Sequence, residues 1–585
     1  MKVKEARPSP ANPFPPVEFQ PPSIPRRWVV GLLLVILAAG GILRLISQGQ
    51  SPPGMNVDEA ANAWNAYCLQ QTGMDQHGVR WPVFRARMFG EADNRSTLFL
   101  YYLLPFVAVS GMKLATVRVA AAVAGLVVIW LTYFVGSRLF GRLTGIVAAA
   151  LLALNPWHLQ QSRWGHEAIL SPLLVMAPLA AFLCANLITL DGEDRGPRPI
   201  LAAVAGLVAG ASCYGYQSIR IFLPAFLTLV VILDWRAWRQ RLQARCGALA
   251  LASLVIAFAL FFVPLAWKQF TDPGMSGRAR AMWVWNETDT VAERFGKALS
   301  RYPGHFGLDF LFVAGDGYAA LSPPAGHGLF PWYTLPLMLL GLTALWHSRS
   351  QSSAARLLFL WLVTYPVGDL VTRHPNPHAL RSLPGLCALV LLAAWGAVYA
   401  GSWLWRRKRP AAVALACALG FALITSHGRF LYDFYGAFNR DQRIYHYYHP
   451  DLLEALDWLQ PRFESVDAVF CTVSKIPHPY IYALVRLGYD PKRWFTDVRD
   501  VVKGPLPNGM HPFEDVYFRV GKIHFLYPNS RDTTLRDLYE NRRSDRIIFI
   551  VRPGEIRFKD TAIRPLLGIS DPGGSPSLLV YELIV

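Results

Sequence analysis

The stretch WVVGLLLVILAAGGILRLIS, residues 28–47, is followed closely by GMNVDEAAN, residues 54–62. Twenty largely apolar residues are enough to span the hydrocarbon core of a bilayer as a helix. Asn56 or Asp58 can cap a second helix, which places both Asp58 and Glu59 in its first turn, beside the positive end of its dipole. The order predicts a membrane protein with two carboxylates at the membrane surface, and a capping role alone is the simplest interpretation of the pair.

The composition of the whole chain also predicts a polytopic membrane protein. Of its 585 residues, 53% are hydrophobic and 16% are charged, whereas roughly a quarter of the residues in soluble domains are charged. The formal net charge is +18, but the basic residues gather in short loops between apolar runs, as they do where charge sets membrane orientation. Nucleic-acid binding is therefore not expected. The seven cysteines are scattered, which indicates neither a disulfide framework nor a cysteine-rich metal cluster.

The apolar runs predict an α-helical architecture of about eleven transmembrane helices. Residues 1–27 are rich in proline, which predicts a disordered cytoplasmic tail. A transmembrane domain would extend over residues 28–428, with a long first external loop at 48–115. Within that loop, the apolar run 98–111 is too short to span and would lie along or dip into the membrane face. The predicted spans are residues 28–47, 116–137, 143–156, 168–190, 200–215, 221–233, 247–266, 329–346, 355–372, 383–404 and 411–426.

This topology can be checked against the basic loops, all of which then fall on the cytoplasmic side. An odd number of spans places the carboxyl-terminal part outside. There, residues 429–585 have a mixed polar texture that predicts a small extracytoplasmic α/β domain, which would cover the membrane part or serve as a docking platform. Its predicted helices are residues 452–459 and 480–487, and its predicted strands are 468–473, 547–551 and 578–585. Gly573-Gly574 is not flanked by a strand and a helix in the order that a nucleotide-binding fingerprint requires.

The external loops bring carboxylates and cations to one water-exposed face. These residues are Asp58, Glu59, Asp93 and Arg95, then His158, His166 and Glu167, then Arg220, Asp316, Arg373, His378 and Arg381. Each one alone is more simply explained as a group at the end of a span that reaches water. Together they suit sugar transfer from a phosphate-linked donor. The leaving phosphate needs cationic or metal stabilisation but no protonation, and the attacking hydroxyl needs one carboxylate as base.

Several stretches follow one another in an order and spacing that resemble a known family. They are Asp58-Glu59, residues 92–101 (ADNRSTLFLY), 155–167 (NPWHLQQSRWGHE), 217–224 (QSIRIFLP), 315–317 (GDG) and 377–381 (PHALR). They resemble the GT-C membrane glycosyltransferases of the bacterial family 39 type, the branch related to protein O-mannosyltransferases and to the aminoarabinose transferases that act on lipid A. The resemblance covers most of the chain. The family pattern that residues 92–101 resemble usually reads Gly-Asp-Tyr-Lys-Pro-Pro-Leu-Tyr, so this chain has Arg-Ser-Thr where the family has Lys-Pro-Pro.

The resemblance implies transfer of a single sugar from a polyprenyl-phosphate donor to a lipid, glycan or protein acceptor at the outer face of the cytoplasmic membrane. Arg95 takes the place of a Lys that touches the donor phosphate. A guanidinium can bind phosphate in a bidentate way, although the geometry differs from that of lysine. Arg220, His378 and Arg381 would complete the phosphate-binding set.

The resemblance also implies roles for the acids. Asp58 corresponds to the family's catalytic base, and Glu59 and Glu167 would position groups or hold a divalent ion, with His166 as a candidate further ligand. Asp93, His166 and Asp316 are further candidates on the same face. A metal is optional: oxygen ligands suit magnesium or manganese, and participation of His166 or His158 would admit zinc.

Two alternatives remain open. A transporter or flippase would carry charges near the bilayer midplane and a repeated hydropathy pattern, whereas Arg44 and Asp369 lie near span ends and no repeat is found. A noncatalytic membrane subunit would have a nearly identical sequence. An oligosaccharide-transferring relative would carry a tryptophan-rich acceptor motif, and none is found.

Overall fold

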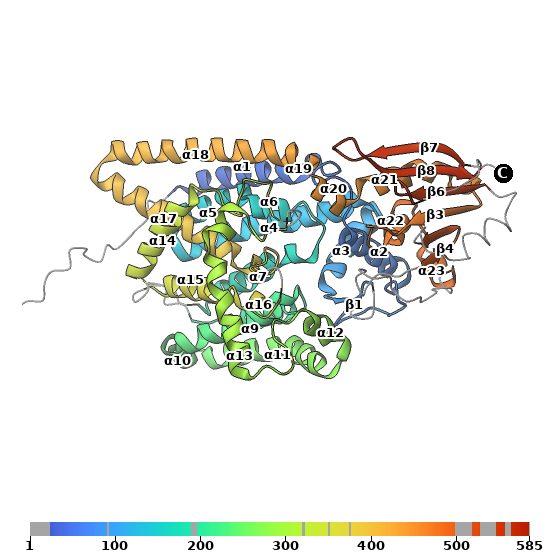
Figure 1. Ribbon diagram of the computed structural model, residues 1–585. Helices are drawn as coiled ribbons and strands as arrows, with labels where there is room; N and C mark the ends of the chain where they lie inside the picture. The colour runs from blue at the N-terminus through green and yellow to red at the C-terminus, as the bar shows by residue number, and fades with distance from the viewer. Residues whose placement is uncertain are drawn as a thin grey trace, which may run out of the picture.

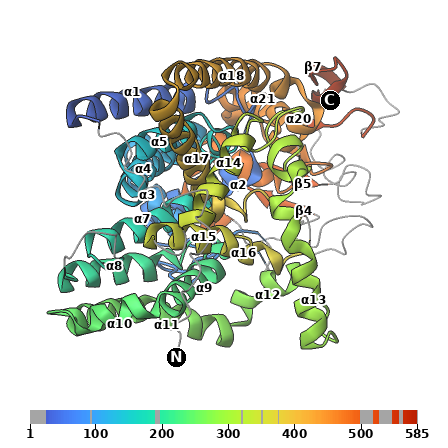
Figure 2. The same cartoon turned by 90° about the vertical axis from the view of Figure 1, so that its left-hand side faces the viewer.

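The computed structural model (Figure 1) describes residues 24–89, 93–188, 196–318, 322–348, 352–373, 376–497, 517–526, 546–555 and 563–583. Residues 1–23 of the predicted tail lie outside these ranges. The helices α1 to α18 form one bundle, and the strands of a sheet gather beyond one end of it, near the carboxyl terminus (Figure 1). Seen after a quarter turn, α1 and α18 lie along one edge of the bundle and α10 and α11 along the opposite edge (Figure 2).

The bundle contains eighteen of the helices in the described residues. They are α1 (Arg26–Leu45), α2 (Val57–Thr72), α3 (Leu98–Ser110), α4 (Leu114–Phe140), α5 (Arg142–Leu154), α6 (Pro156–Gln161), α7 (Leu170–Cys184), α8 (Pro199–Ser212), α9 (Gln217–Leu233), α10 (Trp235–Gln243), α11 (Gly247–Thr271), α12 (Pro273–Met282), α13 (Val291–Arg301), α14 (Thr334–Ser348), α15 (Ser353–Thr364), α16 (Val367–Leu370), α17 (Leu386–Arg407) and α18 (Arg409–Tyr435). Short turns are η1 (Glu167–Ile169), η2 (Tyr302–Phe306), η3 (Asp309–Val313) and η4 (Leu383–Gly385).

The polytopic membrane fold is confirmed, but the count of about eleven spans is not. Within the described chain, six helical segments are long and apolar enough to cross a membrane, and a seventh qualifies if α9 and α10, which meet at 77°, form one broken span. The six are Arg26–Leu45, Leu114–Phe140, Glu167–Cys184, Gly247–Thr271, Leu383–Arg407 and Arg409–Arg440. The apolar helices α5, α8 and α14 have 13 to 15 residues, about 20 Å of helix against a hydrocarbon core of about 30 Å.

The helix α3 is flanked by two residues that contact the acids of α2. Arg95 precedes it and lies 2.6 Å from Asp58, whereas Arg118, in α4, donates a 2.8 Å hydrogen bond to Glu59. With 13 residues, α3 is about 20 Å long, shorter than a hydrocarbon core of about 30 Å, and its path along the membrane face stays a prediction. We call the end of the bundle that carries Asp58 and Glu59 the site end. The basic connection between α17 and α18 lies at the other end (Figure 1).

The carboxyl-terminal part combines short helices with a six-stranded sheet. Its helices are α19 (Ala437–Arg440), α20 (Gln442–Tyr448), α21 (Pro450–Leu459), α22 (Pro479–Arg486) and α23 (Pro491–Asp497), with the turn η5 (Gln460–Ser465). Its strands are β3 (Ala468–Thr472), β4 (Tyr517–Val520), β5 (Ile523–Leu526), β6 (Ile547–Val551), β7 (Ile563–Ser570) and β8 (Pro576–Leu583). The sheet order is β4-β5-β3-β6-β8-β7, with β3 parallel to β5 and β6 and the other pairs antiparallel. The helix α18 runs through the predicted boundary at residues 428/429 and ends at Tyr435.

The carboxyl-terminal part packs directly on α2. Trp64 of α2 meets Trp494 of α23 edge to face, with ring centroids 5.6 Å apart. The indole of Trp494 donates a 2.7 Å hydrogen bond to the carbonyl of Gln76, and the amide of Met55 donates one of 2.7 Å to the carbonyl of Tyr448. The start of α2 is thereby held from the sheet side as well as from the bundle.

Candidate functional site

The first turn of α2 is closed by a capping box. The Asn56 side chain accepts a 2.9 Å hydrogen bond from the amide of Asp58, and the amide of Asn56 donates one of 3.0 Å to Glu59. Glu59 is fully buried and also accepts hydrogen bonds from the Arg118 guanidinium, at 2.8 and 3.0 Å, and from the amide of Gly165, at 3.0 Å. Glu59 therefore links α2 to α4 and to the segment before His166.

Two fully buried arginines fix the chain between α1 and α2. Arg118 donates hydrogen bonds of 2.9 Å to the carbonyls of Pro52 and Gly54. Arg163 donates to the carbonyls of Ser51, at 3.0 and 2.8 Å, and Ile46, at 2.7 Å. Backbone carbonyls that would otherwise be buried without a donor are satisfied in this way. The backbone that leads to Asp58 is consequently held from two sides.

Asp58 faces a different set of partners from Glu59. The small hairpin of β1 (Ala86–Arg87) and β2 (Asn94–Arg95) places Arg95 beside it, with Arg95 Nη1 2.6 Å from Asp58 Oδ1. Arg95 also donates hydrogen bonds of 3.3 and 3.2 Å to Asp93 and lies 4.0 Å from Glu167. Burial alone would lower the pKa of Arg95, but Asp58, Asp93 and Glu167 outweigh burial and raise that pKa above its ordinary value.

His166 joins the acids from the opposite side. Its Nε2 lies 3.5 Å from Asp58 Oδ2 and 3.5 Å from Glu167 Oε2, and Trp164 stacks on its ring at 4.5 Å. Its Nδ1 accepts a 3.0 Å hydrogen bond from the amide of Ala168. In the neutral imidazole the proton must therefore be on Nε2, which points this proton toward the two carboxylates.

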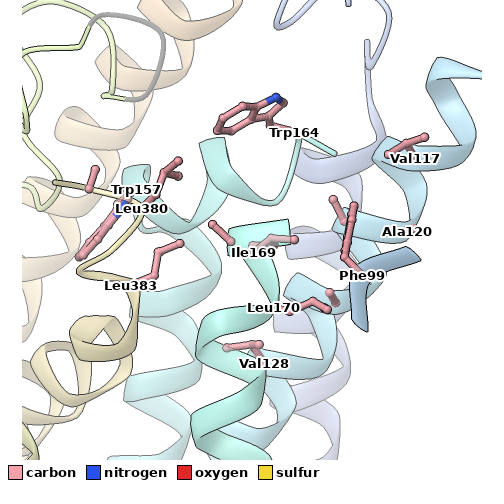
Figure 3. Close-up of a cluster of buried hydrophobic side chains, with 14 of the residues drawn as sticks. Phe99, Val117, Ala120, Val128, Trp157, Trp164, Ile169, Leu170, Leu380 and Leu383 are labelled. Atoms are coloured by element: carbon pink, nitrogen blue, oxygen red, sulfur yellow. The ribbon is translucent and has the colours of Figure 1, made fainter. Parts of the chain in front are cut away.

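The His166 segment rests on an apolar core. Trp164 lies above Ile169, and Val117 and Phe99 approach from neighbouring segments (Figure 3). These side chains, with Leu383 from the segment before α17, are buried. Close packing of this kind keeps the acids above it at fixed separations.

His166 does not fit the predicted role of a metal ligand through Nε2. A ligating imidazole donates its other N–H to an acceptor, whereas Nδ1 of His166 faces a backbone donor. The described residues contain no group of three or more His, Cys, Asp and Glu side chains arranged to hold a metal ion. His158, the other histidine considered for zinc, is fully buried and lies 2.9 Å from the guanidinium of Arg44.

A second group of charged residues comes from the segments around residues 316 and 369–381. Asp369 is fully buried; it lies 3.0 Å from His305 and accepts a 2.7 Å hydrogen bond from the amide of His378 and one of 3.5 Å from Arg381. Asp316 accepts a 3.0 Å hydrogen bond from the amide of Ala379 and lies 3.5 Å from the His378 ring. The two carboxylates thus fix the backbone of the 377–381 motif.

The pKa values in this second group follow from burial. Burial raises the pKa of Asp316, against the hydrogen bonds that the carboxylate accepts. Burial and the neighbouring guanidinium of Arg381 lower the pKa of His378 to about 3. His378 is therefore neutral near pH 7, which removes it as a charged phosphate ligand and leaves it as a hydrogen-bonding group.

A cavity of about 290 Å³ adjoins these residues. Both Arg220 and Arg381 line it, together with Tyr216, Met275 and Trp283. The Tyr216 ring lies 5.9 Å from that of His166, so Tyr216 connects the lining of the cavity to the Asp58 group. Arg220 forms no ion pair with any carboxylate in the described ranges, and its buried Nε has no hydrogen-bond partner there. Two guanidiniums beside apolar side chains suit an anionic group on an apolar chain.

The structure thus sorts the predicted site residues into three sets. Asp58, Asp93, Arg95, His166 and Glu167 meet in one group. His378, Arg381 and Asp316 form the second, with Arg220 lining the same cavity as Arg381. Glu59 stands apart from both and pairs with Arg118. Sequence reasoning missed Arg118, His305 and the partners of Asp369. Arg118 stands inside the apolar run 116–137, and an ionisable residue in such a run is the available signal of a buried partner.

Comparison with known proteins concerns the fold. No protein-family model matches this chain, and no curated protein matches it in sequence. Two crystal structures of ArnT from Cupriavidus metallidurans, one bound to undecaprenyl phosphate and one in the apo state, are similar to it with a TM-score of 0.52 and 13% sequence identity. The match covers 96% and 95% of this chain and 98% of ArnT. An Archaeoglobus fulgidus oligosaccharyltransferase, tethered to an acceptor peptide, gives a TM-score of 0.47 at 14% identity, over 79% of this chain and 63% of that one.

The likeness to ArnT extends over nearly the whole of both chains, so this chain shares the fold of ArnT.

Proposed function

We propose that the protein is a membrane glycosyltransferase that moves a single sugar from a polyprenyl-phosphate donor to a lipid, glycan or protein acceptor. The observation that supports this most directly is a cavity lined by Arg220 and Arg381, whose Tyr216 contacts His166, the neighbour of Asp58. A carboxylate next to a cationic cavity is the pairing that this transfer needs. The likeness of fold to ArnT agrees with the proposal.

In the proposed reaction, Asp58 is the general base. The acceptor hydroxyl attacks the anomeric carbon of the donor sugar while a carboxylate oxygen of Asp58 takes the hydroxyl proton. The bond between that carbon and the phosphate oxygen breaks, and its electron pair remains on the phosphate. A phosphate is a good leaving group without protonation, so no general acid is required, in contrast to glycoside hydrolysis.

The leaving phosphate would lie between Arg220 and Arg381. The charge that develops on its oxygens is stabilised by preorganised guanidiniums, which cost no reorganisation during the reaction. Asp369 and Thr372 hold Arg381, at 3.5 and 2.7 Å, whereas Arg220 keeps a buried donor without a partner in the described residues. The apolar part of the cavity would receive the first units of the polyprenyl chain.

The remaining residues of the first group would position the base. Arg95 would hold and direct the Asp58 carboxylate, and the Nε2 proton of His166 faces the same carboxylate and Glu167. We also propose that Arg95 contacts the donor phosphate, because it takes the place of the motif's Lys that does so. Glu59 acts through Arg118 and the backbone and has a structural role. No step is assigned to a metal, because His166 does not fit as a ligand.

The proposed orientation follows from charge. The basic connections at the end of the bundle away from the site would face the cytoplasm, which places the amino terminus there and the site end, with the carboxyl-terminal domain, outside. A lipid-linked donor explains the membrane setting, because its tail stays in hydrocarbon while its phosphate and sugar reach the site end.

The test of the base is Asp58→Asn in the purified, membrane-reconstituted protein, assayed against a panel of polyprenyl-phosphate sugars. We expect an unchanged melting temperature and a loss of turnover of at least about 10²-fold, since an amide cannot accept the proton. The Asp441→Asn variant, at a half-buried position that does not line the Arg220–Arg381 cavity, is the control and should keep full turnover. Turnover retained by Asp58→Asn would contradict the assignment.

The acceptor can be sought by mass spectrometry of lipids and glycans from a strain that lacks the protein. One molecule should become lighter by one sugar. If the purified wild-type protein transfers no sugar and the deletion changes the mass of no lipid or glycan, the noncatalytic alternative holds instead.

A further inference from the structure

The helix α13 presents an apolar face that nothing in the described chain covers. Val291, Phe295 and Leu299, spaced at i, i+4 and i+8, are 83%, 68% and 54% exposed. None of the residues of α13 is buried. The helix is nevertheless well defined at its start, where Thr290 and Glu293 form a reciprocal capping box.

The other two faces of α13 differ from this one. Arg294, Ala298 and Arg301 are half-buried and face the protein, while Glu293 and Ser300 are exposed and polar. A helix with one apolar, one polar and one protein-facing side suits a boundary between hydrocarbon and water.

The position of α13 agrees with such a boundary. Both views show it running crosswise to α1 and α18 (Figures 1 and 2). Arg301 at its end donates a 2.8 Å hydrogen bond to the carbonyl of Arg373, and Tyr302 donates one of 2.8 Å to the carbonyl of Val363. These partners lie where α15 ends and the Asp369 segment follows, at the site end of the bundle.

We propose that α13 lies in the membrane interface, with Val291, Phe295 and Leu299 inserted among the lipids of the leaflet that faces the site end. The occupant of the apolar face is lipid, because α13 lies beside the ends of membrane helices and the exposed apolar side chains continue along the chain to Phe306 and Leu308. The three basic residues Arg294, Lys297 and Arg301 outnumber the one acid of the helix, which favours anionic head groups.

The placement of α13 in the membrane interface also positions the Arg220–Arg381 cavity. The chain runs from α13 through η2 to His305, which lies 3.0 Å from Asp369, and Asp369 holds Arg381. An inserted α13 therefore fixes the height of the cavity relative to the lipid head groups. The membrane placement of α13 itself does not depend on the proposed function.

The test is spin-label accessibility in lipid nanodiscs containing phosphatidylglycerol, with the full chain. Cys184, Cys246 and Cys417 are the exposed cysteines of the described chain and are first replaced by Ser. A label is then placed by Phe295→Cys on the apolar face and by Ser300→Cys on the polar face. We expect the ratio of oxygen to water-soluble nickel-chelate accessibility to be about fivefold higher at Phe295.

Equal ratios at the two labels, or preferential nickel accessibility at Phe295, would overturn the inference. If Phe295→Cys does not yield folded protein, Leu299→Cys reports on the same face. Neither readout requires transfer activity, so failure here is distinguishable from failure of the proposed glycosyltransferase.

Discussion

Asp58 and Glu59 are neighbours in the same helical turn, yet their side chains have different partners. Glu59 is fully buried, with both carboxylate oxygens occupied by Arg118 and two backbone amides. Asp58 is partly exposed and faces Arg95 and His166. The adjacent acids thus divide between a position enclosed by the protein and a partly exposed position.

Glu59→Gln should destabilise the protein strongly. The substitution leaves the Arg118 guanidinium buried without a counter-charge, and breaking a buried ion pair in this way costs about 3–5 kcal/mol. Thermal unfolding in nanodiscs measures the loss. The matched control is Glu293→Gln, at the same position of the exposed capping box of α13, which should leave the melting temperature unchanged. Equal melting temperatures for wild type and Glu59→Gln would show that the Arg118 pair does not hold α2.

A feature of the site could be predicted from the sequence where it depends on a single segment of the chain. The helix start at residues 56–58 and the clustering of charged residues from several loops at one end follow from local composition and charge. The partners of Glu59 were not predictable, because Arg118 is 59 residues away along the chain and only packing of α4 against α2 brings it close. For the same reason His305 could not be paired with Asp369, 64 residues further on.

The contact between the first loop and the carboxyl-terminal helices depends on Gly54. Its φ is +71°, and a Cβ there would lie 2.3 Å from the carbonyl oxygen of Tyr448 and 2.7 Å from the nitrogen of Pro450. Gly54→Ala should therefore combine left-handed strain of about 1–2 kcal/mol with a steric clash of about 1–3 kcal/mol.

The control is Gly488→Ala, because Gly488 has a φ of +68° and open space around its Cβ position. It should lose only the strain. Melting temperatures and limited proteolysis compare the two variants, and Gly54→Ala should also lose activity, since Asp58 follows four residues later. A Gly54→Ala protein no less stable than Gly488→Ala would mean that the loop can move away from Tyr448.

For the whole molecule, the change from apolar to mixed polar sequence indicated the helical bundle and the carboxyl-terminal part, but not the residue at which they join. The strands β3, β6 and β8 were predicted from apolar runs, whereas β4, β5 and β7 carry mixed residues and were missed. The count of about eleven spans is not confirmed, because a run such as 143–156 has the composition of a membrane helix but only thirteen helical residues. The packing of Trp494 on Trp64 joins segments more than 400 residues apart and leaves no local signal.

The junction also makes stability depend on pH. Burial lowers the pKa of His449 to about 4 and that of His378 to about 3, and His77, beside Arg87, is lowered by burial to about 4. Between these values and about 6.5, the unfolded chain binds protons that the folded chain excludes, so the free energy of unfolding falls as pH falls. Each histidine should contribute a loss of about 1 kcal/mol at pH 5.5 relative to pH 7.5. For Asp451, burial raises the pKa, but the neighbouring Arg552 outweighs burial and the pKa is lowered. The stabilisation that Asp451 provides is therefore lost only below about pH 4, and it does not mask the loss of stability that the histidines cause.

Thermal unfolding at pH 7.5, 6.5 and 5.5 measures this dependence, and His449→Asn is the informative variant. His449 has a φ of 44°, in the left-handed region that asparagine tolerates better than other side chains. Asparagine does not titrate, so His449→Asn should reduce the decline in melting temperature between pH 6.5 and 5.5 by about a third. A decline that is identical in His449→Asn and wild type would show that the buried histidine at the junction of the two parts is not responsible. A melting temperature that rises on acidification would contradict the sign for all three histidines.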